Sequence, residues 1–127
     1  MDKRQTKKFT EYMRSFLMLC QAELGLKKLP KIVWIVDKHG VQGHTFGQFQ
    51  PKDGTIQVSI RGRHPLDIMR TLAHEMVHYL QHTEGRLKPG SGKTGSSEEN
   101  EAHSRAGIIM RHFDKSFPEA FALPPLL

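Results

Sequence analysis

One stretch of the chain, T-L-A-H-E-M-V-H-Y-L-Q at residues 71–81, constrains the fold more than any other. It places His74 and His78 four residues apart, with Glu75 directly after the first histidine. On an α-helix this spacing puts both imidazoles on one face about one turn apart, where two nitrogens can hold the same metal ion. Glu75 lies roughly 100° further round the helix, so it borders the metal and can take a proton from a metal-bound water. The stretch therefore predicts a helix that carries two metal ligands and a base.

Length and composition indicate a single globular domain over residues 1–127. The chain has 127 residues, of which 37% are hydrophobic and 25% charged, enough for one modest core. The longest apolar runs, at residues 16–20 and 32–36, are too short to cross a bilayer, and the basic start does not read as a signal peptide. We therefore expect a cytoplasmic protein without a membrane partner. The single cysteine, Cys20, excludes an internal disulfide and is expected to be a small core residue.

The first half of the chain predicts one helix followed by a small sheet. Apolar residues recur at helical spacing over residues 6–24, and Gly25 is placed to end that helix. Residues 31–37 form a β-branched run that predicts a buried strand. Two more strands are expected at 44–50 and 55–61, and the P-K-D-G turn between them predicts an antiparallel hairpin. Glycines 40, 43 and 47 indicate a bulge, or an edge that another backbone approaches.

The second half predicts two further helices and hence an α+β fold. Pro65 suits the first position of the helix that carries the histidines, and Gly85 is placed to close it. A flexible glycine-rich loop over residues 86–96 follows. Ser96 or Ser97 then caps a third helix that runs to about Phe113, and residues 114–127 are expected to be an irregular tail.

The third metal ligand has to come from outside the histidine helix, because catalytic zinc takes three protein ligands and leaves one position open. The third helix begins with an acidic cluster and then His103. Glu99 shares a helical face with small alanines that would let two helices approach, so it is the first candidate. Glu101 is the reserve candidate. His103, one turn after Glu99, is either a ligand itself or a partner that orients a ligand.

L-A-H-E-M-V-H-Y-L-Q, followed about twenty residues later by E-N-E-A-H-S-R-A-G, resembles the zincin metallopeptidases in which a glutamate from a following helix completes the site. The likeness is greatest to very short single-domain members, including small metallopeptidase-like proteins common in bacteriophage genomes. It covers residues 31–113. It implies a minimal zincin fold. If the protein is phage-encoded, the resemblance places it in the host cytoplasm. By that likeness His74, His78 and Glu99 would bind Zn²⁺ and Glu75 would be the general base. These relatives commonly have Asp or Asn where this chain has His103.

The hypothesis that follows is a zinc metallopeptidase with peptide or protein substrates. Glu75 would remove a proton from the attacking water and return it to the leaving amine. An extended substrate is expected to add to the sheet edge along residues 44–50. A competing hypothesis keeps the metal but makes the protein a non-catalytic binding or structural module, for example a virion or regulatory component.

A third hypothesis is a DNA-associated protease. Between residues 1 and 31 there are eight Lys or Arg against three acidic residues, within a net charge of +6 for the chain. A basic first helix can contact nucleic-acid phosphates weakly, or simply be a solvated face.

Overall fold

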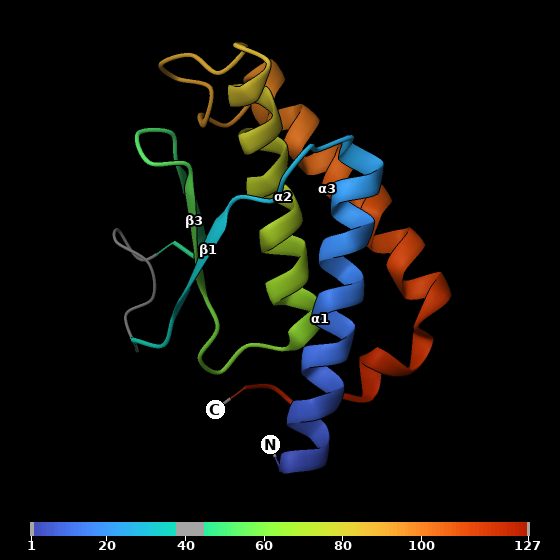
Figure 1. The fold of residues 1–127 in the computed structure, drawn as a ribbon. Helices are drawn as coiled ribbons and strands as arrows, with labels where there is room; N and C mark the ends of the chain where they lie inside the picture. Colours follow the sequence, from blue (N-terminus) through green and yellow to red (C-terminus); the bar gives the residue numbers. More distant parts are fainter. Residues whose placement is uncertain (1, 38–44, 127) are drawn as a thin grey trace.

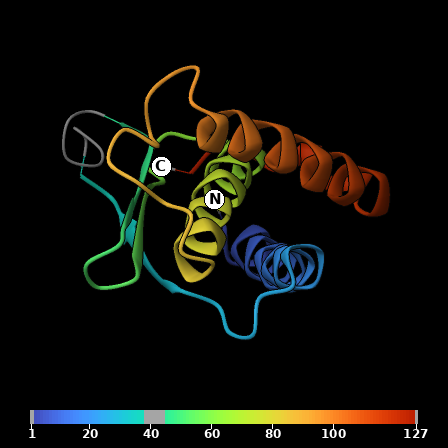
Figure 2. The same cartoon turned by 90° about the horizontal axis from the view of Figure 1, so that it is seen from above.

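The computed structural model describes residues 2–37 and 45–126 and contains three long helices and a small sheet. The elements follow in the order α1 (Lys3–Leu24), β1 (Lys31–Ile35), β2 (Gly47–Gln50), β3 (Thr55–Ser59), α2 (Pro65–Thr83), α3 (Ser97–Ser116) and the 3-10 helix η1 (Pro118–Ala122). Helix α2 lies between the sheet on one side and helices α1 and α3 on the other (Figures 1 and 2). The α+β class predicted from the sequence is confirmed.

The helix ends follow local sequence signals. Asp2 and Gln5 form a capping box, so α1 begins at Lys3, three residues earlier than predicted. Gly25 ends α1 in the left-handed conformation, with φ of 63°, as the sequence predicted. Pro65 occupies the first turn of α2, and the Nδ1 atom of His64 caps that turn by accepting from the Leu66 N–H.

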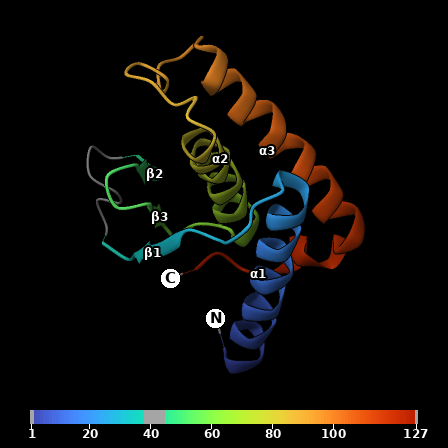
Figure 3. The same cartoon turned by 45° about the horizontal axis from the view of Figure 1, so that its top comes forward.

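The sheet has the order β1-β3-β2, which is visible as three stacked strands in Figure 3. Strands β2 and β3 form the predicted antiparallel hairpin around the turn at residues 51–54, and β1 pairs with β3 in parallel. The prediction of a buried strand at 31–37 is wrong. Strand β1 ends at Ile35 and lies at an edge of the sheet, where Lys31 is exposed and Trp34 is 39% exposed. Its apolar residues reflect a half-buried edge, since one side of β1 has no strand neighbour in the described sheet.

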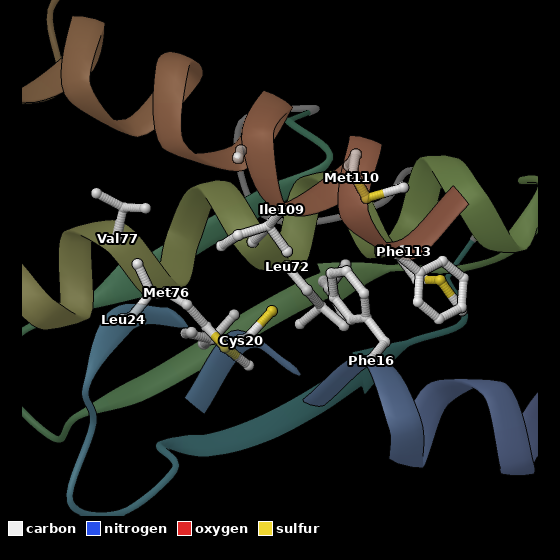
Figure 4. Close-up of a cluster of buried hydrophobic side chains, with 14 of the residues drawn as sticks. Phe16, Cys20, Leu24, Leu72, Met76, Val77, Ile109, Met110 and Phe113 are labelled. Atoms are coloured by element: carbon white, nitrogen blue, oxygen red, sulfur yellow. The ribbon is translucent and has the colours of Figure 1, made fainter. Parts of the chain in front are cut away.

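The hydrophobic core lies where α2 meets the other two long helices (Figure 4). Phe16 from α1 and Phe113 from α3 are fully buried and pack edge to face, with ring centroids 5.5 Å apart. Cys20 is fully buried among them, and burial raises the pKa of its thiol to about 12. The prediction that Cys20 is a core residue is therefore confirmed.

The end of the chain is more regular than predicted. Helix α3 continues to Ser116, and η1 follows, so an irregular tail over residues 114–127 is wrong for most of its length. Ala120 of η1 is fully buried against the core, which explains why this segment is ordered despite its prolines. Within residues 2–37 and 45–126, none of the helices combines the length and apolar character needed to cross a membrane.

Candidate metal centre

Helices α2 and α3 bring three of the predicted site residues together. His74 and His78 lie on the face of α2 that meets α3, with ring centroids 5.0 Å apart. Glu99 lies in the first turn of α3, where Ser96 caps the helix by accepting from the Glu99 N–H at 3.1 Å. The cap fixes where α3 begins, and it therefore fixes which residue faces the two histidines.

The Glu99 carboxylate lies between the two imidazoles. Its Oε1 atom is 2.7 Å from His74 Nε2, and its Oε2 atom is 3.0 Å from His78 Nε2. Ligands of a tetrahedral zinc site, each about 2.0–2.1 Å from the metal, lie about 3.3 Å from one another. Both observed spacings are shorter than that value and are hydrogen-bond lengths, while two imidazoles with one carboxylate form a donor set that suits zinc. These residues therefore suit a zinc ion by donor type, and binding one would require small side-chain shifts.

His103 joins the same cluster. Its Nε2 atom is 3.3 Å from Glu99 Oε1, and its ring centroid is 4.6 Å from that of His74. One donor atom from each of His74, Glu99 and His103 lies within 4.8 Å of the other two, a grouping that does not include His78. His78, however, contacts the other carboxylate oxygen of Glu99. The described residues thus offer three imidazoles around Glu99, four donor side chains in all, and the His103 side chain is the exposed one, at 71%.

The sequence analysis did not identify Gln81, which orients His78. Gln81 is fully buried, and its Oε1 atom is 2.8 Å from His78 Nδ1. Because Oε1 can only accept, Nδ1 carries the proton, and Nε2, which faces Glu99, is the nitrogen left to bind a metal. The Gln81 amide donates to the Glu98 carbonyl at 2.9 Å and to Glu101 Oε1 at 2.8 Å. One signal in the sequence could have identified Gln81. It is a polar residue three positions after a candidate ligand, on the helix face that packs against α3.

Glu101, the reserve ligand candidate, is engaged elsewhere. Its carboxylate accepts from Arg86 at 2.9 Å, from Gln81 at 2.8 Å and from Arg105 at 3.3 Å. These bonds, led by the one from Arg86, lower the pKa of Glu101 to about 2. Glu101 therefore acts indirectly: it positions Gln81 by a hydrogen bond, and Gln81 in turn orients His78.

Glu75 faces the sheet instead of α3. Its Oε1 atom accepts a hydrogen bond of 3.0 Å from the Phe49 N–H of strand β2. The side chain is nearly buried, and desolvation raises the pKa of Glu75 to about 7 in spite of nearby His78 and the Phe49 N–H. Burial also lowers the pKa of His74, although the nearby Glu99 opposes this shift. The lowered pKa favours the neutral imidazole that a metal ligand requires.

Two cavities meet at the cluster, and both are lined by His74, Glu75, Glu99 and Gly47. One, of about 740 Å³, extends toward the start of α2 past several arginines. The other, of about 440 Å³, extends under the glycine-rich loop past Lys88 and Ser91. Strand β2 borders both, so the cluster lies in the middle of a cleft that follows this strand.

Other sequence predictions have mixed outcomes. His82 is exposed, and its ring lies against Phe49. Tyr12 bonds to Glu119 at 3.2 Å and Tyr79 packs on Phe49, so neither tyrosine belongs to the cluster. A bulge or an edge was predicted at Gly40, Gly43 and Gly47. Of these three glycines, Gly47 lies among the described residues, whereas Gly40, Gly43 and also His44 lie outside them.

Nucleic-acid contact stays a prediction. Its candidates are the exposed basic residues of the first two turns of α1: Lys3, Arg4, Lys7 and Lys8.

Comparisons with known proteins give no further identification: no family model, curated protein or solved structure matches the chain. The case for a function therefore rests on the geometry of this cluster and the cleft around it.

Proposed function

We propose that the protein is a zinc-dependent metallopeptidase of the minimal zincin type, in which His74, His78 and Glu99 hold the metal and Glu75 is the general base. One observation carries the proposal. A single carboxylate lies within 3.0 Å of both imidazoles of an H-E-x-x-H helix, while the glutamate of that motif is buried beside them on another face.

A zinc ion held by these residues would supply a Lewis acid that polarises a peptide carbonyl and makes water easier to deprotonate. Glu75 would accept the proton of the attacking water and pass it to the leaving amine. Its raised pKa suits both steps, because a base that titrates near neutral pH can accept and release a proton at similar cost. The Phe49 N–H would hold the carboxylate in place between the two transfers.

Strand β2 supports a peptide substrate. Ser59 N–H donates to the Phe46 carbonyl at 2.8 Å, so the backbone groups of Phe46 point toward β3. The alternation along an antiparallel strand then directs the backbone groups of Gly47 and Phe49 to the opposite edge, beside the cluster. An extended peptide that adds to this edge would pass in front of Glu75.

The test is the Glu75→Gln variant of the full chain, loaded with zinc. We expect the wild type to cleave a general protein substrate such as casein, and Glu75→Gln to bind one zinc ion with cleavage reduced by about a thousandfold or more. Equal cleavage by both proteins would exclude Glu75 as the base, and would point to a contaminating protease.

His103 favours a second candidate function, a zinc-braced binding or structural protein. If His103 joined the other three donors, the metal would have four protein ligands, and closed shells of this kind are structural. X-ray absorption of the zinc-loaded protein distinguishes the two candidates. Three protein ligands with one water support the peptidase, whereas three histidines with Glu99 and no cleavage support the structural protein. The His103→Ala variant should then gain a water ligand.

A further inference from the structure

The cavity that extends from the cluster toward the start of α2 is lined by three arginines. Arg61 and Arg63 precede α2, and Arg70 lies in its second turn. Phe46, which is 63% exposed, and Gly47 form part of the opposite wall. The 740 Å³ volume is large enough for one or two amino-acid side chains of a bound peptide.

Arg63 is held in this wall by neutral groups. Its guanidinium donates to the Ser59 carbonyl at 2.8 Å, to the Asp67 carbonyl at 3.1 Å and to Thr71 Oγ1 at 2.7 Å. The ring of Phe46 covers one face, with its centroid 4.3 Å from the guanidinium carbon. These contacts fix the orientation of the guanidinium, and none of the three acceptors is a carboxylate. Three of the five N–H groups are used, so two remain for a ligand.

The charge of this wall is also unbalanced. Besides Glu75 and Glu99, Asp67 is the one carboxylate among the described residues that line this cavity, and it lies 3.6 Å from Arg70 in an exposed pair, which is a weak interaction. Among residues 2–37 and 45–126, no carboxylate forms an ion pair with Arg61 or Arg63. At this end of the cavity, away from Glu75 and Glu99, three positive side chains therefore lie with one negative side chain among the described lining residues.

The cavity on the other side of the cluster is different. It is lined by the loop residues Leu87, Lys88, Gly90, Ser91 and Gly92, by Gly47, Gln48 and Phe49 of β2, and by Thr45, which precedes β2. Lys88 is the one Lys or Arg there, on a long flexible side chain. The two ends of the cleft thus offer a bound peptide unequal charge, with a pre-positioned guanidinium at one end only.

The position of Arg63 relative to the cluster matches a subsite of a peptide. Thr71, which binds Arg63, precedes Glu75 by one helical turn, or about 5.4 Å along the axis of α2. An extended peptide advances about 3.3 Å per residue. A negative group one or two residues from the bond beside Glu75 would therefore reach the guanidinium.

We infer that the arginine-lined end of the cleft is a carboxylate-binding subsite, so that the substrates are peptides with a carboxylate one or two residues from the cleaved bond on that side. This inference rests on the proposed peptidase function. The carboxylate is either an Asp or Glu side chain or the free C-terminus of the peptide, since both present the same acceptor oxygens to guanidinium N–H donors.

The experiment compares peptides that differ in one group. The zinc-loaded full chain is given matched peptides with Glu or Gln at each position within two residues of a single cleavage site. Each is also made with a free C-terminal acid or an amide. We expect kcat/KM to be at least about tenfold higher for one acidic form. A Glu over Gln preference that persists in the amides identifies a side-chain subsite, and a preference for the free acid identifies recognition of the C-terminus.

The variants assign the preference to the arginines. The double variant Arg61→Gln with Arg70→Gln, whose side chains are exposed, should reduce the preference about threefold or more without unfolding the protein. Arg63→Lys should remove most of it, because lysine keeps the charge but loses the rigid guanidinium whose orientation the neighbouring groups fix. Arg111→Gln, an exposed arginine of α3, is the control for net charge and should keep the preference.

Binding separates this inference from the peptidase proposal. The same peptides are titrated into zinc-loaded Glu75→Gln by calorimetry. If nothing is cleaved but the acidic peptide binds more tightly and the arginine variants abolish the difference, the subsite stands and the peptidase fails. Cleavage without any acidic preference overturns the subsite and leaves the peptidase intact. An arginine effect on binding of a short DNA duplex, with no effect on peptides, also overturns it.

Discussion

Helix α2 contacts the rest of the candidate site on two sides, and the contacts differ in kind. Toward α3 they mostly join side chains to one another, through the Glu99 carboxylate and the Gln81–Glu101 hydrogen bond, with one bond from Gln81 to the Glu98 carbonyl. Toward β2 they join side chains to backbone, since Glu75 accepts from the Phe49 N–H. Gly47 lets the strand approach, because a Cβ atom there would lie 2.4 Å from Thr71 Cγ2.

This difference indicates that the two sides of α2 have separate roles in the site. The α3 side determines where metal-binding atoms point, whereas the β2 side positions the base and the edge to which a peptide would add. Substitutions on the α3 side should therefore lower zinc affinity, and substitutions on the β2 side should lower turnover while zinc affinity stays the same. The following variants test this separation, from the largest expected effect to the smallest.

His78→Ala should have the largest effect. It removes a nitrogen that contacts Glu99 and is oriented by Gln81, so we expect zinc affinity to fall by more than about 100-fold. Competition with a chromophoric chelator measures the loss. His82→Ala, one turn further along α2 at an exposed position, is the matched control and should bind zinc like the wild type. If the two variants bind zinc equally well, His78 is not a ligand.

Gln81→Leu should lower zinc affinity by about 10–100-fold, because the orienting acceptor for His78 Nδ1 is lost while a side chain of similar size stays in the core. Gln48→Leu makes the same chemical change on exposed β2 and should leave zinc affinity unchanged. The same chelator competition applies to both. A loss of affinity in Gln48→Leu would show that the two sides of α2 are not separable.

Gly47→Ala tests the β2 side. The added methyl group has to displace Thr71 and crowd Glu75, so we expect the free energy of unfolding to fall by about 1–2 kcal/mol and turnover to fall with it. Zinc affinity should change by less than about threefold, in contrast to Gln81→Leu. Gly107→Ala is the control in α3, where the added Cβ meets open space. It should raise the free energy of unfolding by about 0.5–1 kcal/mol. Urea denaturation of the zinc-free proteins provides both values.

The α3 side was largely predictable from the sequence, and the β2 side was not. The spacing of His74 and His78 and the acidic start of α3 concern side-chain chemistry, which residue types reveal directly. The cap of α3 was also predicted, as Ser96 or Ser97, because capping depends on residues within one turn, and the structure has Ser96. The bond from Phe49 to Glu75 joins residues 26 positions apart and uses a backbone N–H, which every residue except proline carries. No residue type could have indicated it.

The errors have the same origin. A β-branched run was read as a buried strand, although burial of β1 depends on which strands lie beside it. The tail was predicted to be irregular from its prolines, but Pro118 suits the start of a helix, and Ala120 is buried by contacts with distant segments. The arginine-lined end of the cleft was not predicted because Arg61 and Arg63 come together with Phe46 only in the folded chain.

Ser96→Ala should have the smallest effect, and it tests how tightly the metal site depends on the start of α3. Loss of the cap on the Glu99 N–H, and of the 2.6 Å bond from Ser96 to the Ser91 carbonyl, should lower the free energy of unfolding by about 1 kcal/mol. Ser97→Ala, at an exposed neighbouring position, should have less than half of that effect. Both are measured by urea denaturation with and without zinc.

The zinc affinity of Ser96→Ala distinguishes two ways in which Glu99 can be held in place. If Glu99 is held mainly by its contacts with the two imidazoles, zinc affinity should fall by less than about fivefold, and the loss of stability should be the same with and without the metal. If the cap is what aims Glu99, zinc affinity should fall as far as in Gln81→Leu. In that case α3 would contribute its first turn as a rigid unit, and the backbone would matter on both sides of α2.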